Sequence, residues 1–304
     1  MRKSEIKKEI VNQLNEKLLS IEEVISVTLV GSFIDKHDLS GISDIDTVVI
    51  CKRLDESVFN KCINASSKIN LHKCGLTNYS LKINSTFGPL KFDKKNTVVI
   101  HLMIYDIESH INHVVASPFT CYDWERSKTY EGVPLKKIFP VGVLQFKDFI
   151  TARRSLSNYI EDLNNNQISY REYSFDKGQV KEVAKYNTLD DRHKGEFSYH
   201  IIKNLITNYN KLKKASNISL SENEFIKNAE KYFIQTEENL VKLKKIVKVK
   251  SNRGGKFPKG TVELTKQFIG KFQRSIINDW EDSINIFFIR HFKTDLNDNT
   301  FLGQ

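Results

Sequence analysis

The first residues of the chain carry a pattern of apolar positions that repeats every four residues. Between residues 4 and 19 the repeating positions are Ile6, Ile10, Leu14 and Leu18. Residues spaced in this way lie on one side of an α-helix, where they can be buried together while the charged residues between them face solvent. The pattern therefore predicts an opening helix with one buried face.

Three short runs rich in valine and isoleucine follow, and they have the composition of buried β-strands. They span residues 24–30, 45–51 and 97–105. β-Branched residues favour extended backbone, and the segments between the runs are long enough to hold helices. We expect an α/β (α+β) domain built on a mixed sheet over residues 1–135.

The pattern changes after Pro140, where long segments with helical periodicity dominate. These segments are residues 143–163, 196–214, 223–246 and 261–280. They predict a second, mostly helical domain over residues 136–282. A compact apolar run, Ile286–Ile289, then predicts a short strand within a final segment, residues 283–304.

Composition limits where such a protein would reside and what it would attract. The chain is 39% hydrophobic and 28% charged. No apolar run approaches the roughly 18 residues that a membrane span requires, and the charged start lacks the apolar core of a secretory leader. Four scattered cysteines show no C-x-x-C spacing, which favours reduced thiols. We expect a cytoplasmic protein without membrane contact, whose net charge of +10 attracts anions such as triphosphates, phosphorylated metabolites or RNA.

Two aspartates and a glycine-serine pair form the pattern that suggests chemistry. Gly31-Ser32 follows the first predicted strand, and Asp44 and Asp46 begin the second. Side chains two residues apart on a strand project from the same face, so the two carboxylates converge on one spot, which suits Mg²⁺ (or Mn²⁺). Gly31 lets a polyphosphate approach the backbone, and Ser32 offers a hydroxyl and an N–H group to phosphate oxygens. The alternative is an ordinary turn with solvated aspartates.

The pair Gly31-Ser32 after a strand, followed by Ser43-Asp44-Ile45-Asp46 before an apolar strand, resembles the DNA polymerase beta-type nucleotidyltransferase superfamily. The resemblance covers roughly residues 1–110. It implies transfer of a nucleotidyl group from a nucleoside triphosphate (NTP), with Asp44 and Asp46 as ligands of the catalytic metal.

The same resemblance implies a third acid on a later strand, where this chain has a histidine. His101 is the polar residue inside the apolar run 97–105. A neutral imidazole can bind a metal or act as a general base, which makes His101 the third catalytic candidate. The alternative is a core histidine hydrogen-bonded to a neighbour. Asp93 and Asp106, on the segments that flank this run, are further candidates for the missing acid.

The helical region contributes candidates for binding the triphosphate. By resemblance to helical domains appended to this superfamily, Lys194 or Lys203 would contact the phosphates, although most helix lysines are simply solvated. A basic stretch broken by glycine and proline, residues 248–260, is either a solvated loop or a lid that grips phosphates.

A second motif lies near the end of the sequence. The run Ile286–Ile289 opens into Arg290-His291, with Asn297 six residues after the histidine. This arrangement resembles the first strand and active-site loop of the histidine phosphatase (phosphoglycerate mutase-like) superfamily, with Phe292 in place of the usual glycine. The resemblance implies that His291 accepts a phosphoryl group while Arg290 and Asn297 bind its oxygens. Because so few residues of that domain are present, we expect the chain to be the front part of a bifunctional polypeptide, without phosphatase activity by itself.

These patterns together predict a metal-dependent nucleotidyltransferase. It would move a nucleoside monophosphate (NMP) group from an NTP to a small-molecule or phosphorylated-metabolite acceptor, a choice that rests on the phosphatase resemblance. One alternative is a transferase that modifies RNA or protein. Another is a catalytically degenerate nucleotide-binding module with a regulatory role.

Overall fold

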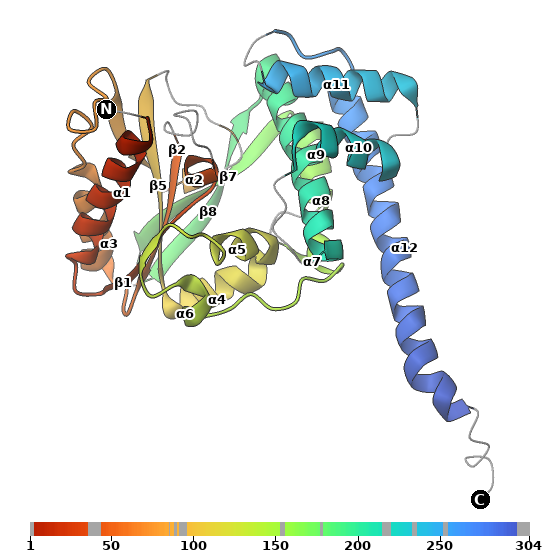
Figure 1. Cartoon of the computed structure of the whole chain (residues 1–304), viewed down its shortest axis with the longest axis horizontal. Coiled ribbons are helices and arrows are strands. Elements are labelled where there is room, and N and C mark those ends of the chain that lie inside the picture. The colour runs from red at the N-terminus through yellow and green to blue at the C-terminus, as the bar shows by residue number, and fades with distance from the viewer. Residues whose placement is uncertain are drawn as a thin grey trace, which may run out of the picture. The chain divides into compact units, whose positions relative to one another are not determined.

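The structure, a computed structural model, forms two compact units that we describe separately. It describes residues 3–35, 44–84, 86–87, 90, 96–152, 156–176, 179–214, 220–232, 236–251 and 255–296. The first unit comprises residues 1–144 and 166–189, and the second comprises residues 145–165 and 190–304 (Figure 1). Among the described residues, no helix is both long enough and apolar enough to cross a membrane.

A five-stranded mixed sheet forms the centre of the first unit. Its strands are β1 (Val24–Val30), β2 (Asp44–Cys51), β3 (Ser80–Asn84), β5 (Thr97–Asp106) and β6 (Tyr130–Gly132), in the spatial order β3-β5-β2-β1-β6. Strand β5 runs parallel to both β2 and β3, whereas β1 runs antiparallel to β2 and β6. The three strands predicted from apolar runs are confirmed as β1, β2 and β5, and the α/β class of this region is confirmed with them.

One face of this sheet is covered by α1 (Lys3–Leu19) and α3 (Glu56–Ser67). The repeating residues Ile10, Leu14 and Leu18 are fully buried there, which confirms the predicted opening helix. Helix α3 begins where the Asp55 side chain accepts a hydrogen bond from the Val58 backbone N–H at 2.9 Å. Such a cap satisfies one of the donors that the first helical turn leaves unpaired.

The opposite face is covered by α4 (Ile107–Ala116), α5 (Pro118–Trp124) and α6 (Leu135–Ile138). The even-numbered residues of β2 point to this side, so Val48 and Ile50 pack here while Ile45 and Val49 pack against α1 and α3. Asp44 and Asp46 belong to the same even-numbered row. A short helix, α2 (Ser32–Asp35), follows β1 directly.

A second, three-stranded sheet completes the first unit, and the sequence patterns did not reveal it. It contains β4 (Thr86–Phe87), β7 (Gln167–Asp176) and β8 (Gln179–Thr188), in the order β4-β7-β8. Strands β7 and β8 pair in antiparallel fashion up to Asp176 and Gln179, so only two residues connect them. The aromatic ring of Phe175 packs on Phe59 of α3, with ring centroids 6.2 Å apart. The chain therefore returns to the first unit within the region that was predicted to be mostly helical.

The second unit is helical in its described part. Its helices are α7 (Asp148–Thr151), α8 (Leu156–Asn164), α9 (Asp191–Lys214), α10 (Glu222–Tyr232), α11 (Glu237–Ser251) and α12 (Thr261–Leu296). Helix α9 packs against both α11 and α12. The core includes Phe197, Phe268 and Phe272, each no more than 1% exposed. The predicted segment 223–246 proves to be two helices, α10 and α11, rather than one.

The strand predicted at Ile286–Ile289 is wrong, because this run lies inside α12, which is helical as far as Leu296. A short apolar run cannot be assigned to a strand or to a helix by its periodicity alone. Here no glycine or proline occurs between Lys271 and Leu296, so nothing in the sequence ends the preceding helix. Arg290 and His291 consequently lie on a helix and not on a loop after a strand, while Asn297 falls outside the described residues.

A buried histidine makes the stability of the first unit depend on pH. His110 of α4 is 1% exposed, and neither ring nitrogen has a hydrogen-bond partner among the described residues. Burial lowers the pKa of His110 to about 4. Below pH 6.5 the His110 imidazole is therefore protonated in the unfolded chain while it stays neutral in the folded chain. The free energy of unfolding consequently decreases as the pH drops from about 6.5 towards 4.

We predict that His110→Leu reduces this pH dependence. Between pH 7 and pH 5, the free energy of unfolding of the parent should decrease by on the order of 2 kcal/mol more than that of the variant. Urea unfolding of both proteins at the two pH values measures this difference, because the shared carboxylates contribute equally to each. The same decrease in both proteins would show that His110 is protonated as readily in the folded chain as in the unfolded one.

Candidate metal centre

Three polar side chains converge on the face of the main sheet that α4, α5 and α6 cover. Asp44 and Asp46 are the first and third residues of β2, and His101 lies in the middle of β5. Asp46 and His101 are register partners across the parallel pair of strands. Because paired residues on adjacent strands project from the same face, the register brings His101 to the side of the sheet that carries both carboxylates.

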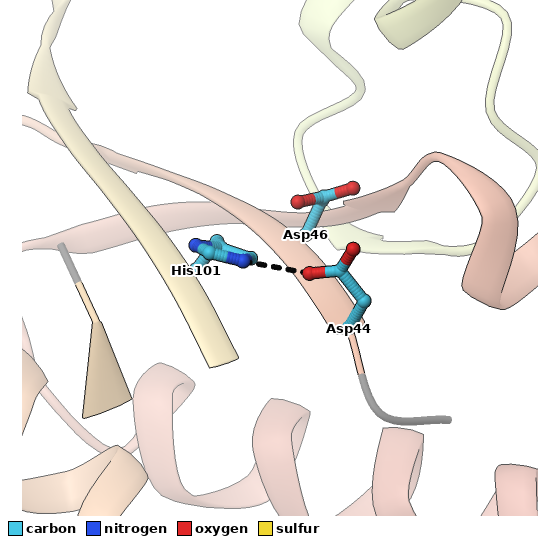
Figure 2. Close-up of side chains that lie close together, drawn as sticks. All are labelled: Asp44, Asp46 and His101. Carbon is cyan, nitrogen blue, oxygen red and sulfur yellow. Dashed lines mark ion pairs between the residues drawn. The ribbon is translucent and has the colours of Figure 1, made fainter. Parts of the chain in front are cut away.

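The three side chains are close enough to act together. The Nε2 atom of His101 lies 2.6 Å from Oδ1 of Asp44, and Figure 2 shows the imidazole reaching from its strand towards that carboxylate. One ligand atom from each of Asp44, Asp46 and His101 lies within 4.8 Å of the others. Two ligands bound to one cation at about 2.1 Å are at most about 4.2 Å apart, so small side-chain rotations suffice to bring all three onto one ion.

The centre lies at the edge of an apolar layer. Val48 and Met103, the next residues on the same face of β2 and β5, are fully buried, whereas the Asp44 side chain is 34% exposed. His101 is nearly as buried as the core and is 8% exposed. The imidazole is thus held by the sheet, and the carboxylates remain accessible from solvent.

Gly31 has a role that the sequence pattern did not indicate. It follows β1 with φ +73°, and a Cβ atom at this position would overlap Oδ2 of Asp46. The preceding residue, Val30, pairs with Asp46 across the antiparallel strands, which explains the close approach. Gly31 therefore accommodates the Asp46 carboxylate. Gly31 and Ser32 are both exposed next to the centre, and their contact with a phosphate stays a prediction.

Two carboxylates and one imidazole could together hold a divalent cation that accepts both oxygen and nitrogen ligands. Mg²⁺ prefers oxygen ligands, while an imidazole also suits Mn²⁺ and other transition-metal ions. His101 is oriented here by its close contact with Asp44, in which Nε2 lies 2.6 Å from Oδ1. Binding of a cation by this nitrogen would replace that contact.

The other acids considered for the third position do not join the centre. The Asp106 side chain accepts a hydrogen bond from the Ser109 backbone N–H at 2.7 Å and caps α4. It is five residues along β5 from His101, or roughly 16 Å at the rise of an extended strand. Asp106 is therefore a capping residue, and Asp93 lies outside the described residues.

The remaining predicted site residues belong to the second unit. The Lys194 ammonium lies 3.4 Å from Oδ1 of Asp191, and the Lys203 ammonium lies 5.9 Å from the centroid of the Tyr199 ring, so both contact their own helix, α9. Their role towards a triphosphate stays a prediction. The roles assigned to Arg290 and His291 also stay predictions, although the strand on which their resemblance depended is absent.

Part of the basic stretch 248–260 is packed against α9. The Phe257 ring lies directly over Gly195, where a Cβ atom would overlap it. The Thr261 hydroxyl donates a hydrogen bond to the Pro258 carbonyl oxygen at 2.6 Å, immediately before α12. Residues 255–260 are thus anchored at two points, which a freely solvated loop would not be.

We predict that Gly31→Ala weakens metal binding because the added methyl group displaces the Asp46 carboxylate. Gly75→Ala is a matched control, since Gly75 has φ +77° and no atom within 4 Å of an added Cβ. Both variants should lose stability by roughly 1 kcal/mol from left-handed backbone strain. Only Gly31→Ala should lose Mn²⁺ affinity, by roughly tenfold or more if one ligand is displaced. Titration of each protein with Mn²⁺, followed by electron paramagnetic resonance, compares them. Equal affinities would place the metal, if any, away from Asp46.

Comparison with known proteins adds no assignment to this geometry. No known protein family matches the chain, and a search of curated proteins found no similar sequence.

Proposed function

We propose that the chain is a metal-dependent nucleotidyltransferase that moves an NMP group from an NTP to an acceptor hydroxyl. The observation that carries this proposal is the convergence of two carboxylates and an imidazole within 4.8 Å on one face of a mixed sheet. Next to them stands Gly31-Ser32, at the end of the neighbouring strand. Carboxylates beside an exposed backbone turn form a site at which cations and phosphates can meet.

The order of these parts agrees with the resemblance to DNA polymerase beta-type nucleotidyltransferases. Gly31-Ser32 follows β1, the two aspartates begin the adjacent antiparallel strand β2, and the third polar residue comes from a later strand, β5. The expected third acid is replaced by His101, which pairs with Asp46 in the register of the sheet. This agreement supports the proposal without extending to the second unit.

In the proposed reaction, Asp44 and Asp46 hold a divalent cation, with His101 as a third ligand or as a proton acceptor. When bound, such a cation neutralises phosphate charge and lowers the pKa of the attacking hydroxyl. The acceptor oxygen forms a bond to the α-phosphorus of the NTP, while the bond from that phosphorus to the bridging oxygen breaks and pyrophosphate leaves. The hydroxyl proton passes to the imidazole or to solvent. The chain's contribution is to position these groups.

The acceptor is not determined by the centre itself. The preference for a small molecule or phosphorylated metabolite depended on the phosphatase resemblance, and the strand that supported this resemblance is helical. The helical conformation of residues 286–289 thus removes the support for a small-molecule or phosphorylated-metabolite acceptor.

One observation favours a second candidate, a nucleotide-binding module without catalytic activity. The contact of 2.6 Å between His101 and Asp44 pairs the third residue with a carboxylate that the reaction needs for a metal. A close pair of this kind can stabilise the start of β2 without any reaction. Nucleotide and metal binding without pyrophosphate release would support this candidate.

We predict that Asp44→Ala and Asp46→Ala each abolish NMP transfer and leave the fold intact. Each removes a metal ligand and little buried volume, so a decrease of roughly 1000-fold, about 4 kcal/mol, is expected. The double variant should be hardly worse than either single one, because the ligands act as a unit. Pyrophosphate release with each of the four common NTPs in Mg²⁺ or Mn²⁺ measures the reaction.

Asp106→Ala is the control for these changes. It removes a carboxylate from the opposite end of β5 and should cost about 1 kcal/mol of stability through the lost cap of α4, with transfer retained. If the Asp44 and Asp46 variants release pyrophosphate at the parent rate, the assignment of the centre is wrong.

His101 allows a sharper test, in which the family's usual acid is restored. His101→Asp should keep or increase activity with Mg²⁺, because it supplies a third oxygen ligand, whereas His101→Ala should lose activity. Rates in Mg²⁺ and in Mn²⁺, together with melting temperatures, compare the variants. If both substitutions lower the melting temperature alike and Asp does not rescue activity, His101 is a packing residue.

A further inference from the structure

The strongest feature outside the metal centre is a run of positive charge in the second unit. From Asn239 to Val262 the sequence contains eight lysine and arginine residues and no aspartate or glutamate. The run covers most of α11 and the segment that leads into α12. It therefore differs from an ordinary solvated face, on which both signs of charge are usually mixed.

Helix α11, which forms the first part of this run, has one buried apolar face and one exposed charged face. Four apolar residues of α11 are buried in the unit, namely Leu240, Leu243, Ile246 and Val247. The opposite row consists of Val241, Lys244, Lys245 and Lys248, all exposed, with the spacing of one helical face. We call Lys244, Lys245 and Lys248 the basic row. The apolar side fixes α11 to the unit, so the basic row faces solvent in a defined direction.

The lysines of the basic row form no ion pair among the described residues, although Glu237 and Glu238 lie in the first turn of the same helix. Lysines at its margins are paired, with the Lys242 ammonium 2.6 Å from Glu238 Oε1 and the Lys250 ammonium 3.4 Å from Glu196 Oε2. Within the described part of the chain, the three lysines of the basic row have no such partner. Like charges held together on one helix face repel one another, so an anionic partner would be bound favourably.

Two further lysines extend the positive surface beyond α11. Lys256 and Lys259 are exposed in residues 255–260. This segment is anchored by the Phe257 ring on Gly195 and by the hydrogen bond from Thr261 to Pro258. The added charges are therefore carried by a docked segment of backbone rather than by a free tail.

We propose that this surface binds a nucleic-acid strand through its phosphodiester backbone. A backbone presents a regular series of negative charges, which matches lysines repeated along a helix, and binding releases condensed counterions. The charged side chains of the basic row are all lysines, which bind phosphates as point charges and do not stack on bases. Recognition therefore depends on charge, with little preference for sequence or for RNA over DNA.

A membrane surface fits these residues less well. Interfacial helices insert a face of large apolar side chains among lipids, and here the apolar face of α11 is buried within the protein. The exposed side offers only Val241 beside the lysines. The surface thus has the charge that anionic lipids attract without the apolar residues that hold a helix in a bilayer.

The basic surface belongs entirely to the second unit and includes no residue of the metal centre. If the proposed nucleotidyl transfer is correct, a bound strand would be a natural acceptor. If that proposal fails, the surface would still bind nucleic acid, and binding assays without NTP or metal separate the two cases.

The test compares the full chain with Lys244→Gln/Lys245→Gln/Lys248→Gln by fluorescence anisotropy, with labelled single-stranded RNA and DNA 20-mers of mixed sequence over a range of salt concentrations. If each lysine contacts one phosphate, the slope of log K against log[salt] should become less negative by about 2, and affinity at 0.1 M salt should fall on the order of 100-fold. Lys256→Gln/Lys259→Gln should change the slope by about 1.4 on the same basis.

The matched control is Lys128→Gln/Lys136→Gln/Lys137→Gln, which removes three exposed lysines from the first unit and gives the same net charge. It should leave both slope and affinity nearly unchanged. Equal losses in the control and the test variant would overturn the proposal in favour of general charge attraction. Absence of RNA and DNA binding by the parent, or tighter binding to vesicles of phosphatidylserine than to either strand, would also overturn it.

Discussion

The parallel pairing of β2 with β5 is the constraint on which the candidate centre depends. The register that aligns Asp46 with His101 also aligns Val48 with Met103 and Ile50 with Tyr105, so one row of contacts is polar at one end and apolar over the rest of its length. A slip of one residue would turn His101 into the layer beneath α1 and α3 and would move apolar side chains of β5 out of it. The packing of the apolar row thus sets the position of the imidazole, and the centre needs no separate scaffold.

The sheet and its aspartates could be predicted because their signals are local. The spacing of Ile10, Leu14 and Leu18 determines the buried face of α1, and two positions of separation place Asp44 and Asp46 on one side of a strand. The contact between His101 and Asp44 could not be predicted in the same way. It depends on which strands are neighbours, on their direction and on their register, and these are properties of the whole sheet.

Two elements escaped the sequence analysis for different physical reasons. Strands β7 and β8 carry many charged and polar residues, so their alternation is weak, although the two-residue connection with Gly178 before Gln179 was a usable hairpin signal. The apolar character of the run Ile286–Ile289 predicts a strand, but the run is continuous with the preceding helical segment and forms part of α12. For β7 and β8 the short connection indicates the structure better than the pattern of apolar residues does. For Ile286–Ile289 the flanking helical sequence indicates it better than the run itself does.

Gly195 gives α9 an indentation in the middle of its first two turns, and the Phe257 ring occupies it. Glycine inside a helix generally costs about 1 kcal/mol relative to alanine. Here the missing side chain leaves room for the Phe257 ring. Two distant parts of the chain are therefore held together by van der Waals packing and not by charge. The orientation of Lys256 and Lys259 is consequently governed by a residue about 60 positions earlier that carries no charge. A methyl group at position 195 would displace the Phe257 ring and leave every charge unchanged. The rigidity of residues 255–260 thus depends on a different residue from those that give this surface its charge.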